Sequence, residues 1–128
     1  MVDGLVLPFW QSGDTRPLTN GLAADAIFSS PAADYHGRAR TVHMLTLIAT
    51  VIDKVDQTGR WLSERDGLYT FTSRVDDQEL HGVVHEEYTA DGRLQHVTLY
   101  LRPYRSLRRA MAKMVQRMED SPLPDHSV

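Results

Sequence analysis

The chain is predicted to fold as one α+β domain, with helices packed on one face of an antiparallel sheet. Three observations predict this class. Residues 38–55 carry an apolar stripe at helical spacing, residues 60–101 form short alternating runs, and residues 107–118 carry a second helical stripe. Helices and consecutive hairpins in separate stretches of one chain are typical of α+β domains.

The long stripe is the clearest helix signal. Its apolar residues recur three and four positions apart, which places them on one face of a helix over 38–55: Val42, Leu45, Ile48 and Ile52. Two short helices are predicted before it, over 3–12 and 16–24, because Pro8 and Pro17 lie where a first helical turn tolerates proline. Ile27 and Phe28 are expected to form a short strand, and 29–37 a loop.

Four strands are predicted over 60–64, 68–75, 78–89 and 93–101. The dipeptides Asp66-Gly67, Asp76-Asp77 and Asp91-Gly92 separate them, and such dipeptides favour hairpin turns. Pro103 closes the last strand. The final helix carries Leu107, Met111, Met114 and Met118, a stripe that is typical of core or interface packing. We therefore expect a meander followed by an amphipathic C-terminal helix.

The length of 128 residues suits one domain and is too short for two independent cores. We place that domain at residues 1–120. Residues 121–128 follow the helix and begin with Ser121-Pro122, which ends it. They are predicted to be a flexible tail.

The formal net charge is -3 and the sequence pI is near 6.0, which argues against general attraction to nucleic acid or to anionic membranes. The six basic residues between Arg102 and Arg117 are interpreted as a solvated helix face. Cysteine is absent, which excludes disulfides and thiolate chemistry. The first residues lack the basic region of a signal peptide, so a cytoplasmic location is expected.

The runs Asp25-Ala26-Ile27-Phe28-Ser29-Ser30-Pro31, Tyr35-His36-Gly37-Arg38 and Asp91-Gly92-Arg93-Leu94 resemble the nuclear transport factor 2-like superfamily and its SnoaL-like branch. The resemblance covers about residues 3–118. It implies a cone formed by a curved sheet and helices, a small-molecule pocket inside the cone, and frequent homodimers. The matched positions are mostly turns and core, so the resemblance predicts fold better than function.

Alternation along the predicted strands provides the expected pocket lining. Every second residue of a strand points to the same face, and the mostly apolar sets are the candidates for contact with a hydrophobic ligand. They are Tyr69, Phe71 and Ser73 on the second predicted strand, Val84 on the third, and Val97, Leu99 and Leu101 on the last.

Glu86, Asp34 and His36 are the candidate catalytic residues. Glu86 shares a strand face with apolar neighbours, and burial raises the proton affinity of a carboxylate, as general acid or base chemistry requires. Asp34 and His36 lie in the loop that borders the cone mouth in the resembling family, where they could transfer a proton. Each assignment has a structural alternative. In these alternatives Glu86 lies in solvent beyond the rim of the pocket, and Asp34 and His36 only hydrogen-bond to backbone groups of their loop.

The resemblance to steroid isomerases does not extend to the catalytic residue that carries the proton. Their proton-shuttling Asp precedes a Pro, and Ser30 stands before Pro31 here. Three functions stay open: a cofactor-independent enzyme acting on a hydrophobic metabolite, a non-catalytic binding protein, and a dimeric interaction module.

No cofactor or metal is expected. No phosphate-binding loop, dinucleotide fingerprint or nucleophile elbow occurs in the sequence. His81 and His85 share a strand face but lie roughly 13 Å apart at the usual rise per residue. One metal ion cannot bind both side chains directly.

Overall fold

The computed structural model describes residues 4–125. In this part of the chain six strands form one sheet, in the order β2-β1-β6-β5-β4-β3. The strands are β1 (Leu22–Ser29), β2 (Asp34–His36), β3 (Asp53–Leu62), β4 (Asp66–Val75), β5 (Gln78–Tyr88) and β6 (Leu94–Arg102). The helices are α1 (Val6–Ser12), α2 (Arg16–Gly21), α3 (Arg38–Ala49) and α4 (Tyr104–Asp120). The predicted α+β class is confirmed.

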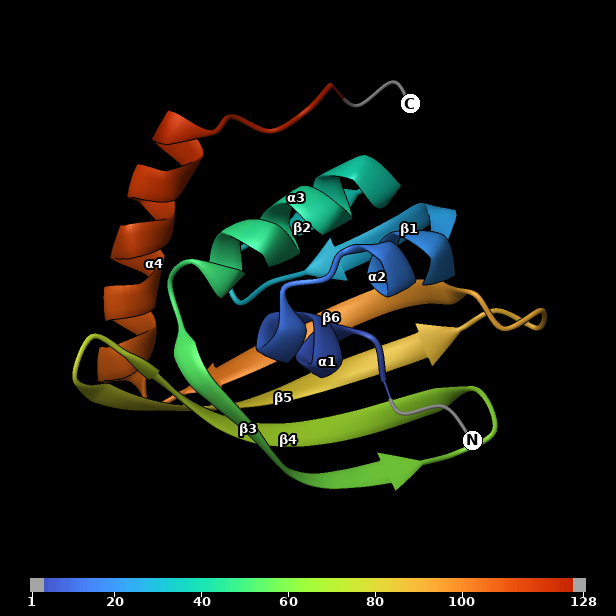
Figure 1. Cartoon of the computed structure of the whole chain (residues 1–128), viewed down its shortest axis with the longest axis horizontal. Helices are drawn as coiled ribbons and strands as arrows, with labels where there is room; N and C mark the ends of the chain where they lie inside the picture. Colours follow the sequence, from blue (N-terminus) through green and yellow to red (C-terminus); the bar gives the residue numbers. More distant parts are fainter. Residues whose placement is uncertain (1–3, 126–128) are drawn as a thin grey trace.

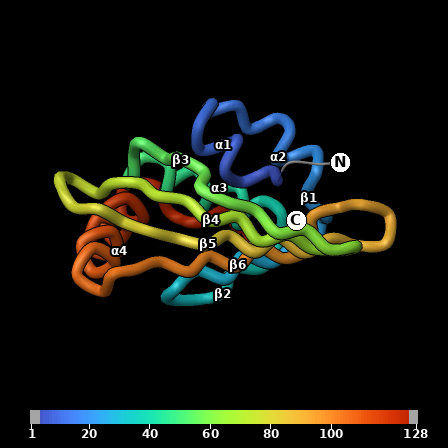
Figure 2. Tube along the Cα trace, turned by 90° about the horizontal axis from the view of Figure 1, so that it is seen from below, coloured from blue at the N-terminus to red at the C-terminus, as the bar shows by residue number. Residues whose placement is uncertain are grey.

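The helices are distributed unequally over the sheet. Helices α1, α2 and α3 lie over one face, and α4 stands across the end where the β4–β5 hairpin turns (Figure 1). Seen from its edge, the curved sheet has α1 and α2 above it (Figure 2). We call the face under α1–α3 the inner face and the opposite one the outer face. The inner face and the helices enclose the hydrophobic core.

The β4–β5–β6 meander has the predicted pairing. β4 pairs with β5 and β5 with β6 in antiparallel registers, so that Tyr69, Val84 and Leu99 are neighbours across three strands. Along β4 the inward residues are buried while the outward residues are more exposed. A half-buried strand shows this period of two, and the alternating sequence pattern predicted it.

The N-terminal part differs from the prediction. α2 ends at Gly21, and Leu22 to Ala24, predicted as helix, begin the eight-residue strand β1. β1 runs parallel to β6 and antiparallel to β2, the latter formed within the predicted loop 29–37. The pairing of β1 with β6 joins segments far apart in the chain, and such tertiary contacts override local propensity.

The long helix is shorter than predicted. α3 ends at Ala49, and Asp53 already begins β3. Val51 and Ile52 are nevertheless buried, because a turn after α3 continues to direct apolar residues to the core. β3 is the edge strand and is exposed along most of its length. A polar edge strand has no alternating apolar signal, which explains why residues 53–55 were predicted as helix and a strand only from residue 60.

Helix α4 is the predicted amphipathic C-terminal helix. Its Arg109 and Lys113 pair with Asp76 in the β4–β5 turn, at 3.3 and 3.0 Å. Past the helix, the carbonyl oxygens of Ser121 and Pro124 contact α3 side chains at 2.8 and 3.1 Å. Residues 126–128 of the predicted tail lie outside the described residues, and its flexibility stays a prediction. No helix within 4–125 is long and apolar enough to cross a membrane.

Candidate functional site

An apolar cavity lies between α3, α4, β6 and the loop that joins β1 to β2. Its volume is about 240 Å³, somewhat below the range of about 300 to 1,000 Å³ that is usual for small-molecule pockets. It is lined by Ser30, Pro31, Ala32, Tyr35, Met44, Ile48, Val51, Ile52, Leu99, Leu101, Leu107, Ala110, Met111, Met114, Val115 and Met118. The cavity therefore has the size to hold a small ligand.

Helical periodicity brings the lining side chains of α4 to one side. Leu107, Met111, Met114 and Met118 recur at three- and four-residue spacing, so they face the body of the molecule as one stripe. The end of α3 forms the opposite wall, and Leu99 and Leu101 point inward from β6. Met side chains are flexible and polarisable, which suits them to a ligand of variable shape.

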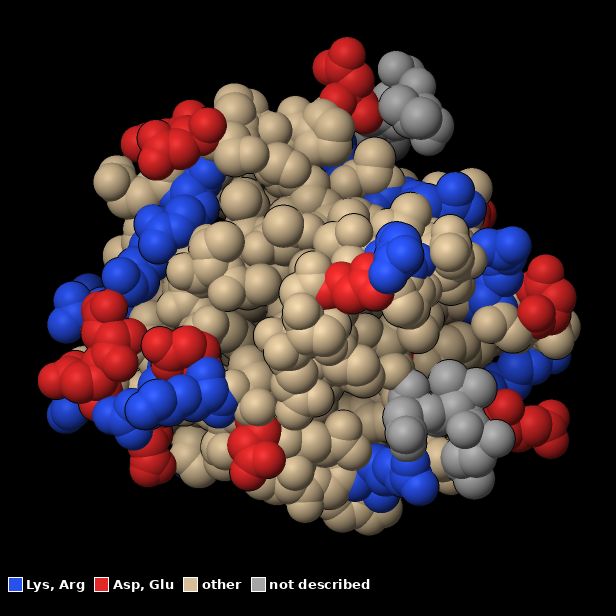
Figure 3. Space-filling model, in the orientation of Figure 1, with Lys and Arg blue, Asp and Glu red and all other residues tan. Residues whose placement is uncertain are grey.

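The lining has almost no polar chemistry. None of the described lining residues is Asp, Glu, His, Lys or Arg. The Ser30 hydroxyl donates to the Ala33 carbonyl oxygen at 3.0 Å and accepts from the backbone N–H groups of Ala32 and Ala33. In Figure 3 the surface between the basic strip along α4 and the centre of the view is hollowed and carries no charged side chain. The cavity offers apolar contact and excludes ions.

Two of the seven predicted lining residues reach this cavity: Leu99 and Leu101. Tyr69, Phe71, Ser73, Val84 and Val97 lie on the inner face as predicted, but each is at most 3% exposed and packed in the core. Trp10 of α1 occupies the space over the sheet, with its ring 5.7 Å from that of Phe71. Its indole N–H donates to the Leu45 carbonyl oxygen at 2.9 Å. Because α1 fills the centre, the open volume lies toward α4.

Glu86 is fully buried, and its carboxylate holds the start of α1. Its oxygens accept the backbone N–H of Leu5 at 3.1 and 3.0 Å and that of Val6 at 2.9 Å. The Tyr88 hydroxyl donates to the same carboxylate. Burial raises the pKa of Glu86 above its ordinary value, against the lowering effect of these hydrogen bonds. Burial and the nearby Glu86 charge also raise the pKa of Tyr88.

The structure does not bring the three candidate catalytic residues together. Tyr35 lines the cavity, so Asp34 and His36, on either side of it in β2, point to the outer face. Glu86 points inward from β5, and two strands separate β5 from β2. At the usual strand spacing that separation is roughly 14 Å. A shared catalytic role for the three residues stays a prediction that this geometry does not favour.

Comparisons with known proteins identify solved structures of the same architecture. No family model and no curated protein matches the chain. A steroid delta-isomerase from Pseudomonas aeruginosa matches with 26% identity and a TM-score of 0.83, over 88% of this chain and 85% of that one. A cystatin-like-fold protein from Silicibacter pomeroyi matches with 20% identity and a TM-score of 0.83, over 91% and 82%.

A nuclear transport factor 2-like protein of unknown function from Mesorhizobium loti matches with 20% identity and a TM-score of 0.67, over 76% of this chain and 84% of that one. These matches agree with the sequence resemblance and with the curved sheet. The chain has the fold of nuclear transport factor 2-like proteins. The resemblance drawn from the turns around Pro31 and Gly92 is confirmed.

Ser30 and Pro31 of this chain line the cavity. The resemblance implies that Ser30 stands where steroid isomerases carry their proton-shuttling Asp. The Ser30 hydroxyl is already bonded to loop backbone. A hydroxyl in that arrangement is not a general base at neutral pH.

Sequence reasoning missed the α3 and α4 walls of the cavity. Ile48, Met111 and Met114 were assigned to apolar stripes that pack in the core or at an interface, and Met44 was not singled out, because a stripe on one helix does not show what it faces. The available signal was the Met content of the α4 stripe, since Met is frequent at adaptable binding surfaces.

Proposed function

We propose that the chain binds a small apolar molecule in the cavity between α3, α4 and β6, without acid–base chemistry on it. The observation that carries this proposal is the lining, in which no described residue has an ionised side chain at neutral pH. Binding of this kind gains free energy from apolar surface removed from water, about 25 cal/mol per Å². Of the functions the sequence left open, this supports the non-catalytic binding protein.

The enzymatic alternative is a proton-transferring isomerase, cyclase, dehydratase or epoxide hydrolase. The likeness to a steroid delta-isomerase structure supports it at the level of the superfamily. A proton-transfer catalyst must reach its substrate within hydrogen-bond distance. Glu86, Asp34 and His36 are not among the residues that line the cavity. The binding function is therefore the one we propose first.

Filling the cavity tests the proposal. Met111 lines the mouth and is 39% exposed, so Met111→Trp should occupy the cavity without disrupting the core. We expect binding of the apolar fluorescent probe N-phenyl-1-naphthylamine to weaken about tenfold or more, which corresponds to about 1.4 kcal/mol. Fluorescence titration provides the measurement.

Gln116→Trp is the matched control, because Gln116 lies on the exposed side of the same helix. It adds the same aromatic surface without entering the cavity, so probe affinity should stay within about twofold of that of the original protein. Equal affinity for both variants and the original protein would place the probe elsewhere. Steady conversion of a bound hydrophobic metabolite would favour the enzymatic alternative.

We also propose that a second copy of the chain covers the outer face, as the resemblance implies. Trp61, Leu68 and Tyr100 are 61%, 39% and 56% exposed on that face, and exposed aromatic residues are enriched at protein interfaces. Sedimentation equilibrium should give twice the chain mass at micromolar concentration, and Trp61→Glu should lower it toward the monomer mass. A monomer mass for the unsubstituted chain would contradict the proposal.

A further inference from the structure

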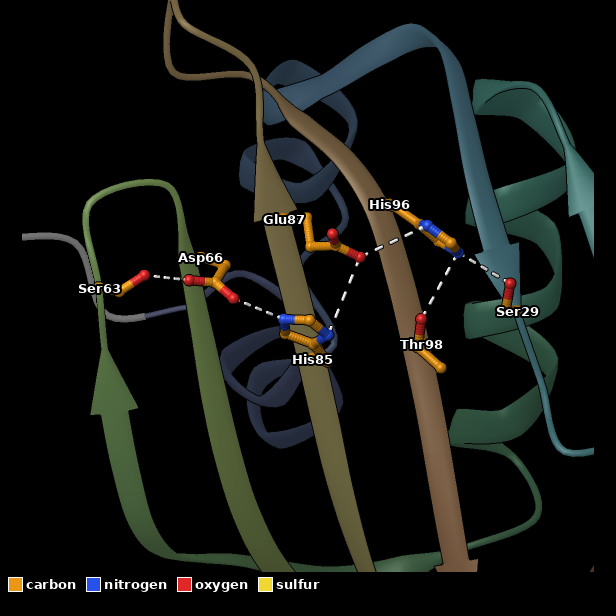
Figure 4. A network of polar contacts seen from close by, with 7 residues as sticks. All are labelled: Ser29, Ser63, Asp66, His85, Glu87, His96 and Thr98. Atoms are coloured by element: carbon orange, nitrogen blue, oxygen red, sulfur yellow. Dashed lines mark hydrogen bonds and ion pairs between the residues drawn. The ribbon is translucent and has the colours of Figure 1, made fainter.

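A connected set of polar side chains crosses the outer face from β4 to β1 (Figure 4). Asp66 contacts His85 at 2.8 Å, and the other ring nitrogen of His85 lies 3.8 Å from Glu87. The same Glu87 oxygen lies 3.5 Å from His96 Nδ1. His96 Nε2 lies 2.8 Å from the Ser29 hydroxyl oxygen. None of these residues lines the apolar cavity, so the set is independent of the proposed binding site.

One end of this set has the order hydroxyl, imidazole, carboxylate. Ser29 Oγ contacts His96 Nε2, and Glu87 Oε2 approaches the opposite ring nitrogen, Nδ1. A carboxylate at Nδ1 favours the tautomer that carries its proton there, which leaves Nε2 free to accept the hydroxyl proton. A nucleophile within reach of a base that a third group orients is the signature of an activated hydroxyl.

We propose that Ser29 is a nucleophile that accepts an acyl group from an ester or thioester, with His96 as its base. Glu87 is the positioning residue that fixes the His96 tautomer. The pairing of β1 with β6 creates this arrangement, because Ser29 lies opposite Thr98 and Ile27 opposite His96 in the parallel register. Ser29 then meets the imidazole diagonally on the outer face.

The step balances within these groups. Ser29 Oγ attacks the acyl carbon while its proton moves to His96 Nε2, and the bond from that carbon to the leaving oxygen or sulfur breaks. His96 returns the proton to the leaving group, which departs as an alcohol or thiol. Water, activated in the same way, then releases a carboxylic acid and restores Ser29. The Thr98 hydroxyl, 3.5 Å from His96 Nε2, can donate to the developing oxyanion.

The neighbourhood restricts the acyl donor. Asp34 lies opposite Ser29 in the β1–β2 register, and Glu87 and Asp66 lie on the same outer face. His85, between Asp66 and Glu87, and His36, opposite Ile27, are the nearby titratable imidazoles. Three carboxylates repel anions, so the donor is a neutral or cationic ester or thioester.

Other serine–histidine contacts in the described chain have a different geometry. Ser121 Oγ lies 3.5 Å from His43 Nε2, but that nitrogen already contacts the Ser121 carbonyl oxygen at 2.8 Å. The neighbouring Ser30 hydroxyl is bonded to loop backbone. Labelling of Ser30 and Ser121 therefore provides the background against which the reactivity of Ser29 is compared.

Acylation by 4-nitrophenyl acetate tests the proposal, with nitrophenolate release followed by absorbance and the modified residue located by peptide mass spectrometry. We expect the acetyl group on Ser29 and its loss in Ser29→Ala. His96→Gln should slow acylation by about 100-fold, within the usual contribution of a general base. Glu87→Gln should slow it by about tenfold, and Glu87→Asp should restore part of the rate.

His85→Gln is the matched control, because His85 also approaches Glu87 but contacts no serine. Its rate should stay within about twofold of the original, and thermal unfolding of each variant verifies folding. Since a second copy on the outer face would shield Ser29, labelling is measured over a dilution series. The proposal is overturned if Ser29 is unlabelled at every dilution, if other serines are labelled equally, or if His96→Gln reacts at the original rate.

Discussion

Replacing Glu86 with Ala is expected to lower the free energy of unfolding by about 3–5 kcal/mol. The substitution leaves the N–H groups of Leu5 and Val6 and the Tyr88 hydroxyl without their shared acceptor. A buried donor left unpaired costs about 1–3 kcal/mol. The loss should be largest around α1, whose first turn the carboxylate holds to the sheet. Urea unfolding of both proteins measures the difference.

Glu79→Ala is the control for loss of a carboxylate from the same strand. The Glu79 side chain is 65% exposed and approaches His81 at 3.5 Å, and surface substitutions of this kind change stability by about 0.5 kcal/mol or less. A loss below about 1 kcal/mol for Glu86→Ala would show that the buried carboxylate does not anchor α1.

The same carboxylate gives a pH dependence of known sign. Burial raises the pKa of Glu86 in the folded chain above its ordinary value of 4.5, so the folded state binds the proton more tightly than the unfolded state. Stability from this group is therefore fully present below pH 4.5 and is lost as pH rises through the folded-state pKa. Relative to Glu86→Gln, the original protein should lose stability over that window and then reach a plateau.

The fold could be predicted where the sequence pattern is local. The β4–β5–β6 meander followed from alternation and turn dipeptides, because adjacent antiparallel strands need only short-range information. β1 could not be predicted at its full length, since its pairing with β6 joins Phe28 to Val97. Lys54 and Asp56 belong to an exposed edge strand, where no apolar period exists to detect.

The candidate functional residues could likewise be predicted where the pattern is local, and not where their position depends on long-range contacts. The inward face of β6 was predicted from alternation, and Leu99 and Leu101 do line the cavity. The buried position of Glu86 was anticipated only as one alternative, and its bond to α1 depends on packing that no spacing encodes. The contact between Ser29 and His96 depends on the β1–β6 register, 67 residues apart in sequence. Sequence reasoning selected Asp34 and His36 nearby but had no means of placing them on the outer face.

Gly82→Val is expected to destabilise the fold by about 3 kcal/mol, at the upper end of the usual cost of overpacking. A Cβ at this position would lie 2.5 Å from Phe71 Cζ and 2.9 Å from Leu101 Cδ2. The absence of a side chain leaves room for the Phe71 ring beside Gly82, and the same ring packs edge-on against Trp10. Because Leu101 lines the cavity, the same substitution should also weaken binding of N-phenyl-1-naphthylamine.

A double-mutant cycle separates this clash from a general effect on β5. Phe71→Leu removes the far end of the ring, so Gly82→Val should destabilise the Phe71→Leu background by at least about 1 kcal/mol less than it destabilises the original protein. Contacting residues show coupling of this size, whereas independent sites are additive to within about 0.5 kcal/mol. Additive losses in urea unfolding would mean that the ring does not depend on the space above Gly82. Coupling would show that the Phe71 ring occupies the space that a side chain at position 82 would need.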